Sequence, residues 1–123
     1  MSRIIVVDDE RTVLQSLDIL LASEGHEVIA FQDGSAAAAA IRSETFDLLI
    51  TDIRMMPVNG MELIRLARQR NPARPCIVIS AFNSDDAVKE CYANGCQAFF
   101  PKPFNLQDVV AAVQKALRLA DDE

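Results

Sequence analysis

The sequence predicts an α/β protein: a doubly wound sandwich around a five-stranded parallel sheet of strand order 2-1-3-4-5. Short apolar runs alternate five times with helix-length amphipathic stretches along the 123 residues. Parallel neighbours need a crossover connection, which a helix supplies. Three of the runs, at residues 4–7, 48–50 and 77–79, are apolar on both faces, as the central strands of a parallel sheet are.

The five predicted strands comprise residues 3–7, 27–31, 48–51, 76–80 and 98–100. The second carries Glu27, and the fifth is short and is followed by Pro101, so both suit the edges of the sheet. The order 2-1-3-4-5 satisfies these requirements, with helices on both faces and the switch point beside the first strand.

The first two helices are predicted over residues 11–24 and near 35–42. In the first, leucine and valine recur at helical spacing, and Gly25 is placed to adopt the left-handed conformation after it. The second contains the run Ala36 to Ala40, which favours helix by propensity but offers little side chain to bury. This helix is therefore expected to pack closely.

The other three helices have recognisable starts. Asn59 and Glu62 stand in capping-box spacing at the third, and the fourth follows Ser84 as its cap and precedes Gly95. The fifth is predicted to open at Asn105. Its inward side chains are predicted to be Val109, Val110, Val113 and Leu117.

Composition narrows the class of protein. With 18 acidic and 12 basic side chains the formal charge is -6, which argues against coating nucleic acid or an anionic membrane. No apolar run reaches the roughly 18 residues that a membrane span needs. Three cysteines without a Cys-x-x-Cys pair fit neither a disulfide framework nor a zinc site, so a reducing cytoplasm is expected. The length of the chain suits one domain, expected over residues 1–123. These cysteines are expected to be small buried hydrophobes: Cys76, Cys91 and Cys96.

The reactive side chains follow the strands at their carboxyl ends, where sheets of this kind bind ligands. They are Asp8, Asp9 and Glu10 after the first strand, Asp52 after the third, Ser80 at the end of the fourth and Lys102 soon after the fifth. Any one of them alone is more often a solvated helix start, a turn residue, a backbone-bonded hydroxyl or a surface charge. Their joint placement at neighbouring strand ends favours a site.

Carboxylates gathered in this way repel one another unless a cation lies between them. Hard oxygen ligands in an open crevice suit Mg²⁺, which is often completed by a phosphoryl oxygen. Lys102 and Ser80 would add a positive charge and a hydroxyl donor for the same phosphoryl group. Asp52 can then act as a nucleophile, and the constellation indicates a phosphoryl acceptor.

Four segments carry a resemblance to a known family. They are IIVVDDE at 4–10, DLLITDIRM at 47–55, IVISA at 77–81, and residues 95–104, which end in KPF. In this order and spacing the chain resembles, over nearly its whole length, the receiver domain of bacterial two-component response regulators of the chemotaxis-regulator type. That resemblance implies a flavodoxin-like (βα)5 fold.

The resemblance also implies roles at the site. Asp52 would accept the phosphoryl group from a sensor histidine kinase or a histidine phosphotransfer protein. Lys102 would pair with the phosphoryl group. Asp9 would ligate Mg²⁺, or Mn²⁺ in its place, directly, with Asp8 acting through water and Asp52 and the backbone carbonyl of Arg54 as further ligands. Such a domain is a substrate and switch that assists its own phosphorylation and dephosphorylation, not an enzyme.

Further implied features concern the switch. Ser80 would move toward the phosphoryl group, and Phe99 would turn inward into the space it leaves. The Lys102–Pro103 peptide bond would be cis, a state that X-Pro bonds reach cheaply. The face of the fourth helix, fifth strand and fifth helix would meet an output domain or protein. Whether phosphorylation drives homodimer formation stays open.

The chain departs from the family pattern at three places. Met56 occupies the usual proline position and Pro57 follows one residue later, so the turn after Asp52 is expected to differ. Phe99 replaces the commoner tyrosine and removes a hydroxyl. Pro101 deletes an amide donor at the sheet edge.

Two other functions compete with that of a phosphoacceptor. A flavodoxin-like cofactor protein needs a phosphate-binding loop after the first strand, where the acids would repel a flavin phosphate. A phosphorylation-independent interaction domain would not need the intact set of site residues. The sequence also leaves open a stand-alone receiver or part of a longer regulator. Five arginines are predicted to form a solvated face, with a partner surface as the weaker alternative: 54, 65, 68, 70 and 74.

Overall fold

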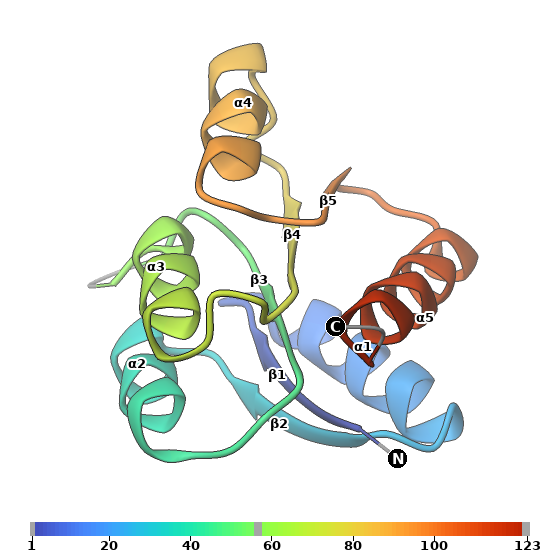
Figure 1. Ribbon diagram of the computed structural model, residues 1–123. Coiled ribbons are helices and arrows are strands. Elements are labelled where there is room, and N and C mark those ends of the chain that lie inside the picture. Colours follow the sequence, from blue (N-terminus) through green and yellow to red (C-terminus); the bar gives the residue numbers. More distant parts are fainter. Residues whose placement is uncertain (1, 56–57, 122–123) are drawn as a thin grey trace.

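A computed structural model of the protein describes residues 2–55 and 58–121, and Figure 1 shows strands alternating with helices along them. The strands are β1 (Arg3–Val7), β2 (Glu27–Phe31), β3 (Leu48–Thr51), β4 (Cys76–Ser80) and β5 (Ala98–Pro101). The helices are α1 (Arg11–Ser23), α2 (Gly34–Ser43), α3 (Gly60–Arg70), α4 (Asp85–Ala93) and α5 (Leu106–Asp121). All strand pairs are parallel in the order β2-β1-β3-β4-β5, which confirms the predicted fold class and strand order.

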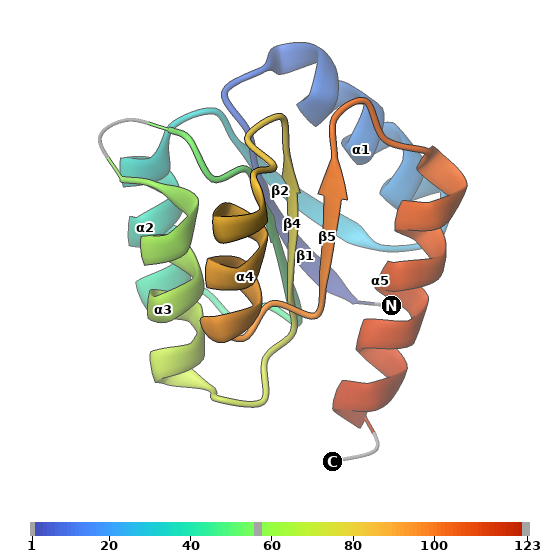
Figure 2. The ribbon, with the colours of Figure 1, turned by 90° about the horizontal axis from the view of Figure 1, so that it is seen from above.

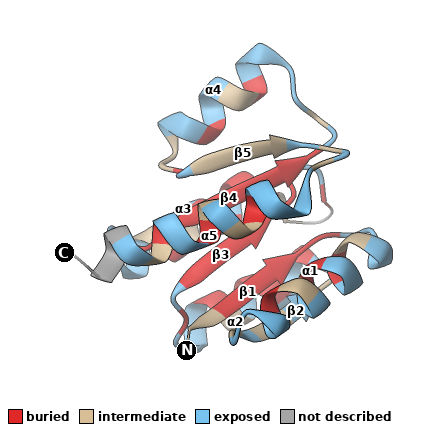
Figure 3. Ribbon diagram, turned by 90° about the vertical axis from the view of Figure 1, so that its right-hand side faces the viewer, coloured by how far each residue is buried: buried red, intermediate tan, exposed pale blue. Residues whose placement is uncertain are grey.

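The helices form two layers, one on each face of the sheet. Viewed from above, α2, α3 and α4 cover one face and α1 and α5 cover the other (Figure 2). Successive strand residues alternate between the two cores: Ile5 and Val7 pack beneath α2 and α3, whereas Ile4 and Val6 pack beneath α1 and α5. The central strands β1, β3 and β4 are accordingly buried, while β5 is only partly covered (Figure 3).

Local sequence signals account for most helix ends. Gly25 has a φ angle of 90°, the left-handed conformation predicted after α1, and Gly95 after α4 has a φ angle of 100°. The side chains of Asn59 and Ser84 cap α3 and α4, as predicted. Asn105 precedes α5 and is not its first residue, because its side chain accepts hydrogen bonds from the backbone N–H groups of the first turn.

The inward face of α5 differs in part from the prediction. Val109 and Val113 are buried, whereas Val110 and Leu117 are only partly buried. Ala116 is buried in their place, because the stripe that faces the sheet runs through 109, 113 and 116 at helical spacing.

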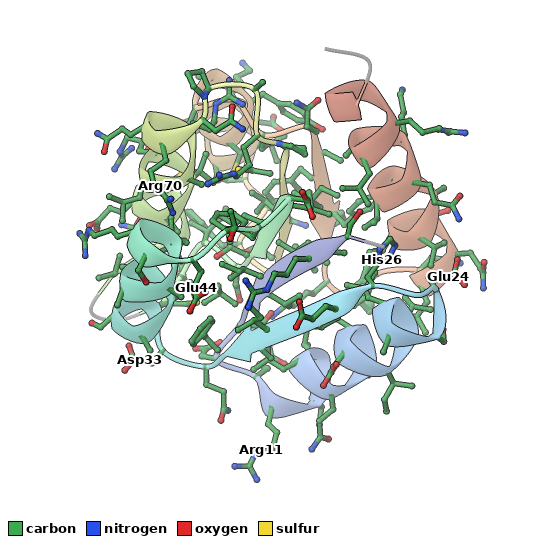
Figure 4. All side chains as sticks on the ribbon, turned by 60° about the horizontal axis from the view of Figure 1, so that its bottom comes forward. Arg11, Glu24, His26, Asp33, Glu44 and Arg70 are labelled. Atoms are coloured by element: carbon green, nitrogen blue, oxygen red, sulfur yellow. The ribbon has the colours of Figure 1, made fainter. Side chains whose placement is uncertain are left out.

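Two arginines make structural contacts, and the prediction of a solvated arginine face is wrong for Arg74, which is buried, whereas Arg70 is exposed as predicted. Arg70 reaches from α3 to the end of α2 (Figure 4), where its guanidinium donates hydrogen bonds of 2.7 Å to the carbonyls of Ile41 and Glu44. Arg74 is only 8% exposed and lies over the Phe46 ring at 4.0 Å from its centre. Its pKa is lowered, chiefly by burial and then by the nearby charge of Arg70.

The three cysteines are buried free thiols, as predicted. Among the helices of the described residues, none combines the length and apolar character needed to cross a bilayer.

Candidate functional site

The predicted site residues meet at the carboxyl ends of the central strands, and backbone hydrogen bonds fix two of them. The N–H of Asp8 donates to the carbonyl of Phe31 at 3.0 Å, and the N–H of Asp52 donates to the carbonyl of Val7 at the same distance. These bonds continue the pairing of β1 with β2 and of β3 with β1 beyond the strand ends. Both carboxylates are therefore held by the sheet itself.

Four carboxylates converge here. Asp8, Asp9, Glu10 and Asp52 each offer an oxygen atom, and these atoms all lie within 4.8 Å of one another. Asp8 and Asp52 are buried, whereas Asp9 and Glu10 are exposed. The three aspartates are the metal ligands that the family resemblance implies, and the carboxylate of Glu10, expected at the same strand end, lies beside them.

Lys102 lies among these carboxylates. Its Nζ is 2.9 Å from Oδ2 of Asp8, 2.8 Å from Oε1 of Glu10 and 3.0 Å from Oδ2 of Asp52. The backbone N–H of Lys102 also donates to the carbonyl of Ser80 at 3.0 Å, which ties the segment after β5 to β4. The Lys102–Pro103 peptide bond is cis, as the family resemblance implies.

Burial and charge shift two pKa values at this cluster. Burial raises the pKa of Asp8 to about 6, although the backbone N–H of Glu10 and the ammonium of Lys102 act in the opposite direction. Burial alone would lower the pKa of Lys102, but the hydrogen bonds to Glu10, Asp8 and Asp52 outweigh it and raise that pKa. Lys102 is therefore a fixed positive charge at neutral pH.

Ser80 and Phe99 lie on the neighbouring strands β4 and β5. Ser80 is buried at the end of β4, and its hydroxyl oxygen accepts a hydrogen bond from the N–H of Phe82 at 3.0 Å. Phe99 is opposite Val78 in the ladder between β4 and β5, and it is only partly buried against the core beneath α3 and α4. The movement of either side chain stays a prediction.

A cavity of about 680 Å³ opens beside the carboxylates, with Asp9 and Arg54 among its lining residues. The guanidinium of Arg54 lies 3.6 Å from the centre of the Phe82 ring, which connects the segments that follow β3 and β4. The role of the Arg54 carbonyl as a ligand stays a prediction. The expected change of turn at Met56 and Pro57 lies outside the described residues.

Gly60 is a positioning residue that the sequence reasoning missed. It begins α3, and its N–H donates to the carbonyl of Ile53 at 2.8 Å. A Cβ atom at Gly60 would lie 1.9 Å from the backbone oxygen of Asp52, far closer than atoms can approach. Only glycine lets α3 start this close to Asp52, and its place directly after the Asn59 cap is the sequence signal that could have found it.

The donor set fits a hard divalent cation. Carboxylate oxygens are what Mg²⁺ prefers, and a cluster with a few carboxylates leaves coordination positions for water and a phosphoryl oxygen. Lys102 offsets one of the four negative charges. The remaining negative charges favour binding of a cation at this cluster and disfavour binding of an anion without one.

Comparison with known proteins identifies the family. The family model described as the response regulator receiver domain matches residues 4–114. The chain is 36% identical over 112 residues to the DNA-binding transcriptional regulator NtrC of Salmonella typhimurium, and 36% identical over 127 residues to the response regulator MprA of Mycobacterium ulcerans. These matches cover 91% and 98% of the chain but only 24% and 53% of the two relatives.

Solved structures of receiver domains have the same fold as this chain. A receiver domain protein of the CheY-like type from Methanospirillum hungatei superposes with a TM-score of 0.93 at 27% identity, covering 99% of this chain and 98% of that one. A receiver domain from Clostridium thermocellum gives a TM-score of 0.86 at 26% identity, covering 96% and 95%. With its family match, its fold and the acidic cluster around Lys102, the chain belongs to the response regulator receiver domain family.

Proposed function

We propose that the protein accepts a phosphoryl group on Asp52, in a Mg²⁺-dependent reaction, from a sensor histidine kinase or a histidine phosphotransfer protein. The observation that carries the proposal is the ammonium of Lys102 held 3.0 Å from Asp52 within a cluster of carboxylates. A nucleophile, a fixed positive charge and a cation-binding donor set are the parts that phosphoryl transfer to a carboxylate needs.

The ion would be held by Asp8, Asp9 and Asp52, with the Arg54 carbonyl as a further ligand and Mn²⁺ as a substitute. When bound, it neutralises the charge of the phosphoryl oxygens. The buried side chains of Asp8 and Asp52 are preorganised for this, because their backbones are bonded to the neighbouring strands.

Phosphoryl transfer to Asp52 would be a single displacement at phosphorus. An oxygen of the Asp52 carboxylate forms a bond to phosphorus while the P–N bond of the donor phosphohistidine breaks, and the bonding electron pair leaves with the imidazole nitrogen. Lys102 and the Ser80 hydroxyl would bind the phosphoryl oxygens. The protein is the substrate and switch in this reaction and not a turnover enzyme, although the same residues assist its phosphorylation and dephosphorylation.

The phosphorylated state would be read elsewhere on the surface. Movement of Ser80 toward the phosphoryl group would open space for Phe99, which lies on β5 and is only partly buried. The face of α4, β5 and α5 would then change for an output domain or protein. Support for a separate output region comes from the two relatives NtrC and MprA, because this chain covers only 24% and 53% of their lengths.

Intact-mass measurement tests the proposal. The protein is incubated with a small acyl phosphate donor and Mg²⁺, and a gain of one phosphoryl group is expected. Asp52→Asn should show no gain, whereas the control Asp18→Asn, which changes an exposed aspartate on α1, should behave as the wild type. An unchanged wild-type mass would overturn the proposal and favour a phosphorylation-independent interaction domain.

A further inference from the structure

Lys102 has as many carboxylate partners as it has N–H groups. An ammonium carries three donors. In this structure Nζ lies within 3.0 Å of one oxygen from each of Asp8, Glu10 and Asp52. No donor is left over for a phosphoryl oxygen, so one of the three carboxylates must give way when Lys102 binds one.

Burial decides which carboxylate leaves most easily. The side chains of Asp8 and Asp52 are 2% and 8% exposed, whereas that of Glu10 is 54% exposed. A released Glu10 is solvated by water at once, while a released Asp8 or Asp52 would remain buried without its counter-ion. Asp52 is in addition the proposed acceptor. Glu10 is thus the partner that costs least to remove.

Glu10 also has an alternative position. It is the residue before α1, yet its side chain makes no capping hydrogen bond, and the first turn of α1 contains no acidic residue. The N-terminus of a helix has free N–H groups and a positive end of its dipole, which favour a carboxylate. A cavity of about 380 Å³ lined by Glu10, Val13, Lys102 and Phe104, among others, gives the side chain room to move.

We propose that Glu10 is a positioning residue that holds Lys102 in the unphosphorylated protein and yields its place to a phosphoryl oxygen during transfer. This inference rests on the proposed function. The contact keeps the ammonium directed at the cluster, but it must break before Lys102 can bind the phosphoryl group. Glu10 therefore slows phosphorylation of Asp52, and removing the contact speeds it.

Two variants and a control separate contact from charge. Glu10→Ala removes the negative charge and the contact with Lys102. Glu10→Asp keeps the charge, but its side chain is one methylene shorter, so its carboxylate is withdrawn from the 2.8 Å contact with the ammonium. Glu24→Ala removes an equal charge near the far end of α1 from Glu10; Figure 4 shows Arg11 and Glu24 at the two ends of this helix. Rate constants for phosphorylation by a small acyl phosphate are measured by intact mass at saturating Mg²⁺.

Both Glu10 variants should be phosphorylated about threefold faster than the wild type, as expected from the loss of one exposed ion pair, and Glu24→Ala at the wild-type rate. Unchanged or slower rates in Glu10→Ala would overturn the inference. The inference would also be overturned if Glu10→Ala were phosphorylated faster while Glu10→Asp kept the wild-type rate, because the negative charge and not the contact would then determine the rate. If the wild type itself gains no phosphoryl group, the proposed function fails first, which is a different result.

Calorimetric titration of the unphosphorylated proteins with Mg²⁺ gives a readout that does not depend on transfer. A positioning role predicts that Glu10→Ala binds Mg²⁺ with nearly the wild-type affinity. A loss of about tenfold or more would mean that Glu10 binds the metal or orients its ligands, and would overturn the assignment.

Discussion

Replacing Gly60 with alanine is expected to displace Asp52 and slow its phosphorylation while the fold persists. The new Cβ would lie 1.9 Å from the backbone oxygen of Asp52 and 3.0 Å from Cα of Ile53. Both contacts are to backbone atoms, which cannot swing aside as a side chain can. The start of α3 and the segment after β3 must therefore separate by about 1 Å or more before the atoms reach ordinary contact distance.

The expected loss of stability in Gly60→Ala can be worked out from typical free energies. Overpacking costs about 1–3 kcal/mol, and the Gly60 hydrogen bond to Ile53, now 2.8 Å, would lose about 1 kcal/mol if broken. Alanine regains up to about 1 kcal/mol over glycine in a helix. The net loss is about 1–3 kcal/mol, less than the 5–15 kcal/mol typical of folded domains. A displacement of about 1 Å at a reacting group can cost on the order of 100-fold in rate.

Gly25→Ala provides the matched control. Gly25 has a φ of 90° but no atom within 4 Å of a built Cβ, so alanine there costs about 1–2 kcal/mol of backbone strain without touching the site. Urea unfolding followed by circular dichroism gives the stabilities, and intact mass gives the phosphorylation rates. A slow Gly60→Ala beside an unaffected Gly25→Ala is expected. Equal rates in both variants would refute the argument from close approach.

Three more predictions follow from burial and hydrogen bonding. Burial raises the pKa of Asp8 from 3.8 to about 6, so the folded protein holds this proton more tightly than the unfolded chain between about pH 4 and 6. The free energy of unfolding of the wild type relative to Asp8→Asn should thus fall as pH rises through this window, and urea titrations showing a rise would contradict it. Arg70→Ala should lose about 1–2 kcal/mol in the same assay, because two carbonyls at the end of α2 lose their donor; wild-type stability would show that water replaces it without cost. Burial raises the pKa of Cys76 and Cys96 to about 12 and that of Cys91 to about 11, so iodoacetamide at pH 8 should label these thiols only in denaturant; rapid labelling of the native protein would contradict their burial.

The fold could be predicted because its signals are local. Alternation of apolar runs with amphipathic helices, caps such as Asn59 and Ser84, and glycines at helix ends each act over a few residues. The parallel sheet then brings strand ends to one edge whatever their separation in sequence, which is why Asp8, Asp52 and Lys102 could be placed together.

The remaining features depend on how long side chains pack across the fold, which periodicity does not encode. The sequence places Glu10 at the same edge of the sheet as Lys102, but it does not show that Glu10 contacts this lysine, which is 92 positions away. Arg74 reads as a surface charge but stacks on Phe46, and Arg70 caps a different helix from its own. Gly60 stands directly after the Asn59 cap, but the sequence does not give the distance between the start of α3 and the backbone of Asp52, on which the role of Gly60 depends.

The site of phosphorylation tests the account most directly. After incubation with a small acyl phosphate and Mg²⁺, borohydride reduction converts a phosphorylated aspartate to homoserine, which peptide mass spectrometry can locate. The account predicts the modified residue at Asp52 alone, held beside Lys102 and Asp8. Modification at another aspartate, or none when Mg²⁺ is saturating, would contradict it.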